Sequence, residues 1–381
     1  MQRAEIPDKT DHKEAETMKY RLLSHNRLDR MYVFLRMIRH TRTKSKYARK
    51  RVRKIIHGGY NGTNKEFREV VCRYWKQYGE KPQKYWFDLY CVGKEAYDPR
   101  YITDPIWFRK IIPYFNNLVL RQAYVDKGMY NRLMTDVKKP ETVVKRVGGY
   151  YYDGDGETAI TRSEAEALCE QEEQLIFKPS TYTGGGSGVT FFDNENHDLS
   201  AGELFDRFTA GFVAQRLVKQ HPDLARINKD SLNTVRVVSF RFKGEVHILS
   251  TILRMGGIGS RVDNLSSGGM SCRIEADGRL AEKSVNKKSE WKEEHPSGLK
   301  FRDITVPSFD KIIKTVKRLH LTLPYFDLIG WDFAVDESGD PVFIEFNVMP
   351  EQNQLSCGPS FGELTDEVLA AVYGDKLPER F

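Results

Sequence analysis

The stretch between residues 327 and 350, DLIGWDFAVDESGDPVFIEFNVMP, limits the possible folds more than any other part of the chain. Its apolar residues alternate on both sides of a short polar segment, which predicts a β-hairpin whose turn is residues 337–340, flanked by Asp336 and Pro341. In this register Asp332 lies opposite Glu345, with Asn347 on the same face. The side chains expected on the opposite face, in a core, are those of Trp331, Phe333, Val335, Val342, Ile344 and Phe346.

Two carboxylates on adjacent strands, with Cβ atoms roughly 5 Å apart, repel each other unless a cation or a proton lies between them. A hard divalent ion bound by oxygen atoms would remove this repulsion, with phosphate oxygens as its remaining ligands. The hairpin therefore predicts a metal site at Asp332, Glu345 and Asn347. The alternative is a hairpin whose polar face meets only water.

A second candidate site is the glycine-rich segment after Lys178, which stands at the end of a strand at residues 175–177. Glycines let a backbone approach phosphate groups closely, and a lysine adds a positive charge. The residues of interest in this segment are Gly185, Gly186, Ser187 and Gly188. A flexible connector is the alternative interpretation.

Arg236 and Arg254 occur within otherwise apolar strands, expected at residues 235–242 and 246–254. A buried guanidinium without a partner is costly, so each should face a carboxylate or a cleft. A cleft that binds phosphate or a developing negative charge is one interpretation of these arginines, and a structural salt bridge is the alternative for each of them.

The pattern of helices and strands predicts an α+β fold. We expect a helical, basic region over residues 1–117, a small α+β unit over 118–200 with a helix after a capping box at Ser163 and Glu166, and a larger α+β unit over 201–381. Residues 202–219 are expected to form a helix and a connector.

Composition narrows the class of protein. The first twenty residues are polar and no segment is apolar enough to span a membrane, so a cytoplasmic location is expected. The five cysteines have no metal-ligand spacing. Nine Lys or Arg residues lie between Arg39 and Lys54, which suits nucleic acid, anionic lipid or simply a solvated helix face. We expect no nucleic-acid partner, and weak peripheral membrane contact stays open.

The spacing D-x12-E-x-N resembles the magnesium site of the ATP-grasp superfamily. Other segments follow in that superfamily's order: AYVDKGMYNRLM with Lys127, then Lys178 with its glycine loop, then AGFVAQRLVKQ. The phrases DPRYITDPIWF and IIPYFNN make the chain similar to the sugar-transfer-associated ATP-grasp proteins. The resemblance implies that Lys127 and Lys178 hold ATP, that Gln215 and the backbone of Arg216 and Leu217 contact adenine, and that Asn264 belongs to a further loop over the site.

The resemblance also implies an ATP-grasp fold and a Mg²⁺-dependent ligase that joins a carboxylate to an amine through an acyl phosphate. The implied substrates are small molecules, possibly sugar-linked, in polysaccharide biosynthesis. Amino-acid ligases of this superfamily commonly carry an arginine two residues before the first metal aspartate, where this chain has Gly330. Arg236 or Arg254 would have to supply the missing charge. A kinase acting on a hydroxyl and a basic binding module are the alternatives.

Overall fold

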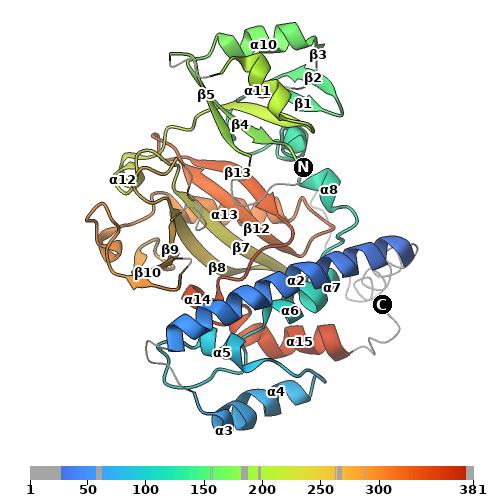
Figure 1. Ribbon diagram of the computed structural model, residues 1–381, viewed down its shortest axis with the longest axis vertical. Helices are drawn as coiled ribbons and strands as arrows, with labels where there is room; N and C mark the ends of the chain where they lie inside the picture. Colours follow the sequence, from blue (N-terminus) through green and yellow to red (C-terminus); the bar gives the residue numbers. More distant parts are fainter. Residues whose placement is uncertain are drawn as a thin grey trace, which may run out of the picture.

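Two antiparallel β-sheets organise the chain, and they lie one above the other in Figure 1. The computed structural model describes residues 27–56, 62–154, 156, 158–181, 188–195, 199–261, 263, 268–286 and 288–374. The smaller sheet has the strand order β3-β2-β1-β6-β4-β5, and the larger one has the order β11-β10-β9-β8-β7-β12-β13. The predicted α+β class is confirmed.

Two helices pack on one face of the smaller sheet. Its strands are β1 (Thr142–Val147), β2 (Tyr150–Asp153), β3 (Ala159–Ile160), β4 (Gln174–Pro179), β5 (Thr190–Asp193) and β6 (Phe212–Arg216). Helices α10 (Arg162–Glu170) and α11 (Ala201–Arg207) share a core with Leu175, Phe177, Phe212 and Ala214. Because side chains alternate along a strand, Lys178 and Gln215 lie on the opposite face.

The larger sheet is covered on both faces. Its strands are β7 (Thr234–Phe242), β8 (Glu245–Met255), β9 (Met270–Ile274), β10 (Leu280–Asn286), β11 (Trp291–Lys292), β12 (Leu328–Val335) and β13 (Pro341–Asn347). Strand β12 is buried along its whole length, which explains its almost continuous apolar sequence. On one face, Trp331 and Phe333 join a core with Phe309, Ile312, Val316 and Leu319 of α13 (Phe309–His320).

The N-terminal helices cover the other face of the larger sheet. Leu328, Val238 and Phe240 share one core with these helices and with α15 (Thr365–Gly374). The helices and π-helical segments (η1, η2) of this region are α2 (Arg27–Ile56), α3 (Asn64–Glu66), η1 (Phe67–Cys72), α4 (Arg73–Lys76), α5 (Lys84–Tyr90), α6 (Asp104–Ile106), η2 (Trp107–Ile111) and α7 (Ile112–Phe115). The described helices of the N-terminal region therefore share a core with the larger sheet.

Short helical elements complete the chain. They are α8 (Arg121–Tyr124), η3 (Lys127–Met129), α9 (Tyr130–Leu133), α12 (Pro222–Ala225), η5 (Phe301–Asp303), α14 (Gln354–Cys357) and η6 (Gly362–Leu364). All five cysteines carry free thiols. Among the helices of the described residues, none combines the length and the apolar character needed to cross a bilayer.

Two features of the smaller unit differ from the expected pattern. Residues 202–219 were expected to form a helix and a connector. The helix α11 ends at Arg207, and residues 212–216 form β6, which pairs with β1 and β4 within the smaller sheet. The smaller sheet therefore extends past the boundary placed at residue 200. The capping box of α10 consists of Thr161 and Glu164 rather than Ser163 and Glu166.

Candidate active site

The hairpin of β12 and β13 sets Asp332 and Glu345 side by side. The strands pair antiparallel, with Asp332 opposite Glu345 and Gly330 opposite Asn347. Residues directly opposite each other on paired strands point to the same face of the sheet. Asp332 and Glu345 therefore lie on the same face of the larger sheet, as the alternation of the sequence predicts.

The turn of this hairpin is longer than expected. Val335, not Asp336, lies opposite Pro341, and a β-bulge between Asp332 and Phe333 then shifts the register. The bulge compensates for the extra turn residue, because one added residue on the second strand offsets one added residue in the loop. The predicted pairing of the two carboxylates is retained for this reason.

The bulge also changes which side chains enter the core. Phe343 packs there, with its ring centroid 5.8 Å from that of Phe333. Val342 and Ile344 lie outside that core, so the prediction that they belong to it was wrong. A one-residue shift reverses the facing of every side chain between the bulge and the turn.

Arg236 and Arg254 both bind Asp332. Arg236 of β7 donates through Nε to Asp332 Oδ1 and through its NH2 nitrogen to Oδ2, the latter at 2.7 Å. Arg254 of β8 donates to Asp332 Oδ2 at 3.2 Å, and its other terminal nitrogen lies 3.6 Å from Asp263 Oδ1. Thr234 donates its hydroxyl hydrogen to Asp263. The arginines thus have carboxylate partners, and their guanidinium groups converge beside the hairpin.

The electrostatics of this cluster follow from enclosure and pairing. Enclosure by protein opposes ionisation of Asp332, but Arg236 and Arg254 outweigh it and lower its pKa. For Asp263 enclosure dominates, and its pKa is raised even though Arg254 is near. The pKa of Arg236 is raised, because the attraction of Asp332 exceeds the cost of burying the guanidinium. Asp332 is therefore an anion and both arginines are cations.

Two lysines reach the same place from other elements. Lys127, the first residue of η3, puts Nζ 3.0 Å from Glu345 Oε2. Lys178 of β4 donates to Gln215 Oε1 at 3.1 Å. Enclosure by protein and the charge of Lys127 lower the pKa of Lys178 to about 8. Three cations thus contact the Asp332 and Glu345 pair, and Lys178 lies close enough for the charges of Lys127 and Glu345 to act on it.

The residues expected to contact adenine, through the side chain of Gln215 and the backbone of Arg216 and Leu217, lie at the end of β6. Gln215 lies beside Lys178 and donates to Thr142 Oγ1 at 3.2 Å. Arg216 turns its side chain toward Glu141 and Glu172, at 2.5 and 2.7 Å. Leu217 follows the end of β6 and is 37% exposed. Within the described part of the chain, Gln215 contacts a site lysine, Lys178, and Arg216 and Leu217 do not.

The glycine-rich segment is only partly described. Gly188 has a φ of +76°, and a Cβ there would lie 2.9 Å from Pro179 Cγ. Its left-handed backbone and its close approach to Pro179 both require glycine. Gly185, Gly186 and Ser187 lie outside the described residues, and so does Asn264.

Gly330 makes room for Arg236. A Cβ at Gly330 would lie 2.9 Å from Pro350 Cβ and 3.4 Å from the NH1 nitrogen of Arg236. The space that a side chain at position 330 would occupy is thus filled by the guanidinium from the neighbouring strand and by the segment after the hairpin. Arg236 therefore supplies a charge at the position where the sequence comparison noted a missing arginine.

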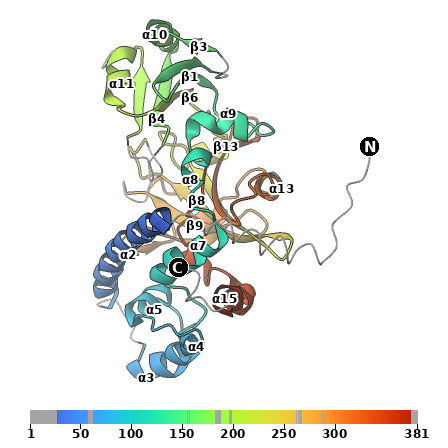
Figure 2. The same cartoon turned by 90° about the vertical axis from the view of Figure 1, so that its right-hand side faces the viewer.

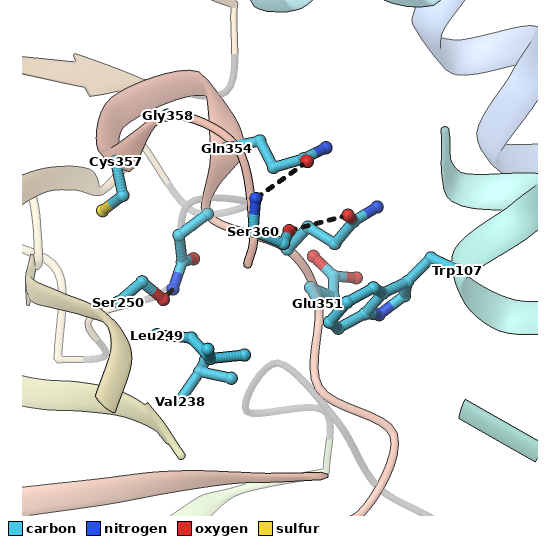
Figure 3. A pocket seen from close by; sticks show the side chains of 11 residues that line it. Trp107, Val238, Leu249, Ser250, Glu351, Gln354, Cys357, Gly358 and Ser360 are labelled. Carbon is cyan, nitrogen blue, oxygen red and sulfur yellow. Dashed lines mark hydrogen bonds between the residues drawn. The ribbon is translucent and has the colours of Figure 1, made fainter. Parts of the chain in front are cut away.

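A small pocket lies next to Val238 of β7, whose side chain is on the same face of the sheet as that of Arg236 (Figure 3). Val238, two residues after Arg236, forms one wall with Leu249, and Trp107 of η2 forms another. The residues after the hairpin cross over it, and Asn353 Nδ2 donates to Ser250 Oγ at 2.9 Å. The other lining residues are Glu351, Gln352, Gln354, Cys357, Gly358 and Ser360.

Glu351 brings a negative charge into this pocket. Its side chain is 65% exposed, although the surrounding protein opposes its ionisation. Lys44 of α2 forms an ion pair with it, and this attraction lowers the pKa of Glu351. Glu351 is therefore an ionised carboxylate that faces the pocket.

Sequence reasoning missed Asp263, Lys44 and Glu351. Lys44 could have been found, because the inward residues Thr41, Ala48 and Val52 of α2 have helical spacing and place residue 44 on the same face. No local pattern marks Asp263 or Glu351, whose partners come from distant strands and helices.

The chain is similar to a known protein family. The sequence profile of the sugar-transfer associated ATP-grasp family matches residues 126–366. None of the curated proteins compared with the chain matches it significantly.

Among solved structures, D-alanyl-alanine synthetase A from Vibrio cholerae is 14% identical, with a TM-score of 0.39, over 66% of this chain and 64% of that one. A biotin carboxylase complex from Campylobacter jejuni is 14% identical, with a TM-score of 0.41, over 68% and 48%. This chain thus spans less than two thirds of either protein. The family match covers more than half of the chain and contains Lys127, Lys178, Arg236, Arg254 and the whole hairpin, so the protein belongs to the sugar-transfer associated ATP-grasp family.

Proposed function

We propose that the protein is an ADP-forming ligase that joins a carboxylate to an amine through an acyl phosphate. The observation that carries this proposal is that Lys127, Arg236 and Arg254 contact the Asp332 and Glu345 pair, while Lys178 lies close enough to Lys127 and Glu345 for their charges to act on it. Such a set of cations suits a triphosphate and the negative charge that develops when a phosphoryl group is transferred.

The residues of the hairpin fit a magnesium ion bound together with a nucleotide. No group of three His, Cys, Asp or Glu side chains in the described part of the chain forms a metal site by itself. Magnesium in nucleotide sites, however, takes one or two carboxylates and completes its shell with phosphate oxygens and water. Glu345 and Asp332, with the amide oxygen of Asn347, would hold it, and the ion would neutralise charge on the phosphates.

The protein's own groups then have separate tasks. Lys127 and Lys178 would hold the triphosphate, with Gln215 near the adenine. Arg236 and Arg254 would orient the substrate carboxylate, whose oxygen attacks the γ-phosphorus while ADP departs. An amine nitrogen would next attack the acyl carbon, phosphate would leave, and the nitrogen would lose a proton to solvent. Alignment and charge neutralisation are sufficient for this chemistry.

The ammonium group of the amine would bind at the pocket beside Glu351. Apart from Glu351, the groups that line the pocket are neutral, and Trp107, Val238 and Leu249 give it apolar walls. An ionised carboxylate between apolar walls suits an ammonium group on a compact carbon skeleton. The family name suggests an amino sugar or amino acid as the amine, and a uronic acid or other sugar-linked acid as the carboxylate.

Hydroxylamine separates ligase from kinase. The protein is incubated with Mg-ATP, a panel of sugar acids and hydroxylamine, and both ADP and hydroxamate are measured. A ligase gives hydroxamate with one of the acids, in amounts that match the ADP. A phosphate ester that survives hydroxylamine would establish a kinase and overturn the proposal.

The pocket is tested with the acid found in that screen. Glu351→Gln should raise the KM for the amine about tenfold or more, because a charged hydrogen-bond acceptor is lost. The hydroxylamine reaction should be unchanged, since this small nucleophile does not need the pocket. Glu363→Gln, at a side chain that is 94% exposed, is the matched control. An unchanged KM in Glu351→Gln would move the amine site elsewhere and leave the ligase assignment intact.

A further inference from the structure

Helix α2 forms an outer layer of the molecule, as the view in Figure 2 shows. Its inward face carries Met37, Thr41, Ala48 and Val52, all buried and spaced by four, seven and four residues. The rest of the helix, where its side chains are described from Phe34 to Lys54, is largely exposed. The outward face is therefore available to a partner.

This outward face is strongly and uniformly positive. Between Arg30 and Ile56 the sequence contains no Asp or Glu. The exposed cations of the helix are Arg36, Arg39, Arg42, Lys46, Arg49, Lys50, Arg53 and Lys54.

None of these eight cations forms an ion pair with another residue that the structure describes. The contrast with the rest of the surface is clear, because Arg100, Arg162 and Arg216 each pair with two carboxylates. The positive charge of these eight residues is therefore not neutralised by ion pairs within the described part of the chain. From Arg36 to Lys54 the helix extends this charge over about 27 Å.

Apolar side chains continue the same face toward the start of the helix. Met31 is 53% exposed and Leu35 is 56% exposed. Met31, Leu35, Arg42, Lys46 and Arg53 follow one another by four and seven residues, which places all five on one stripe of the helix. Phe34, 47% exposed, lies beside this stripe. One stripe thus begins with exposed apolar groups and continues with cations.

We infer that this stripe of α2 binds the surface of an anionic membrane. A helix that lies in the interface inserts apolar side chains between lipids while its lysines and arginines contact the headgroups. Binding to nucleic acid would use the cations but would give Met31 and Leu35 no role. The inward side of the same helix carries Lys44, the partner of Glu351, so membrane binding would hold the pocket close to the headgroups.

Vesicle sedimentation with the full chain tests the inference. Wild-type protein should bind phosphatidylcholine vesicles that contain phosphatidylserine, release them at high salt, and ignore vesicles of phosphatidylcholine alone. Arg42→Gln/Lys46→Gln/Arg53→Gln should lower the partition coefficient about a hundredfold. Met31→Ser/Leu35→Ser should lower it about tenfold.

Matched controls separate the stripe from general surface effects. Lys311→Gln/Lys314→Gln/Lys317→Gln removes three exposed lysines of α13, which lies on the side of the molecule opposite α2 in Figure 2. Ile258→Ser/Leu321→Ser removes apolar side chains that are 68% and 60% exposed. Both controls should bind vesicles like the wild type, and the thermal unfolding of all variants should match.

Three results would overturn the inference. The triple charge variant of α2 could bind vesicles as the wild type does. Neutral vesicles could bind as well as anionic ones. Duplex DNA could bind with an affinity that the triple variant loses and the Met31→Ser/Leu35→Ser variant keeps, which would identify nucleic acid as the partner.

Discussion

The guanidinium of Arg236 occupies the space beside Gly330, with its NH1 nitrogen 3.4 Å from the place where a Cβ at residue 330 would stand. Val238 is the residue of β7 opposite Gly330, so Arg236 reaches diagonally across the pair to do this. The missing side chain at Gly330 and the diagonal reach of Arg236 therefore depend on each other. It explains how a chain without an arginine on β12 still presents a positive charge there.

Gly330→Ala should lower both stability and activity. The new Cβ would lie 2.9 Å from Pro350 Cβ, which is closer than carbon atoms tolerate, and it would press on Arg236. We expect a loss of about 1–3 kcal/mol in the free energy of unfolding, measured by urea denaturation, as for other overpacked sites. Gly374→Ala, where a Cβ meets nothing within 4 Å, is the control. Equal stability of Gly330→Ala and the wild type would show that Arg236 does not need this space.

Glu345→Gln should abolish the magnesium dependence of nucleotide binding. The variant keeps the shape of the side chain but removes the charge that would face the metal, and we expect the affinity for Mg-ATP to fall at least about tenfold. Isothermal titration calorimetry with Mg-ATP, and with ATP in the presence of EDTA, measures the affinity for the nucleotide with and without the ion. Glu337→Gln, exposed in the turn of the same hairpin, is the control. If Glu345→Gln still distinguished the two ligands as the wild type does, the ion would bind elsewhere.

The affinity for ATP should fall as the pH rises through about 8. The pKa of Lys178 is lowered to about 8, so its amino group is positively charged below that pH and neutral above it. If the charge of Lys178 holds phosphate, the association constant should decrease by up to about tenfold for each further pH unit. Lys178→Arg stays charged throughout and should remove the decrease. A wild type and a Lys178→Arg variant with the same pH profile would exclude Lys178 as the titrating group.

The sequence predicts the parts of the site that depend on local pattern. Alternation along β12 and β13 is sufficient to place Asp332 opposite Glu345, even though the turn and the bulge each differ from the simple hairpin. The bulge itself is not visible, because it depends on Phe343 packing against Phe333 and Trp331 on the next strand.

Contacts between distant segments could not be predicted in the same way. Lys44 and Glu351 are 307 residues apart, and the sequence around each residue does not indicate that α2 will contact the segment after the hairpin. Residues 212–216 were expected within a helix and its connector, yet they lie between β1 and β4 as a strand. Hydrogen bonding to β1 on one side and β4 on the other makes residues 212–216 a strand, and the sequence of the segment does not show which strands will flank it.

The start of α10 shows that the same local motif can occur at two overlapping positions in the sequence. Ser163 and Glu166 have the right spacing, but Thr161 and Glu164 have it too, and the helix begins two residues earlier. Thr161 accepts a hydrogen bond from the backbone N–H of Glu164 at 3.2 Å, while the Glu164 carboxylate accepts from the backbone N–H of Thr161 at 2.7 Å. This reciprocal pair satisfies two backbone groups that the first turn leaves open.

Thr161→Ala should therefore lower the free energy of unfolding by about 1 kcal/mol, because it removes the cap. Ser163→Ala should change it by less than about 0.5 kcal/mol, since residue 163 is exposed inside the first turn. Urea denaturation of both variants measures the difference. A larger loss in Ser163→Ala than in Thr161→Ala would mean that α10 begins at the later position in solution, and that β3 is followed by a longer loop than the structure shows.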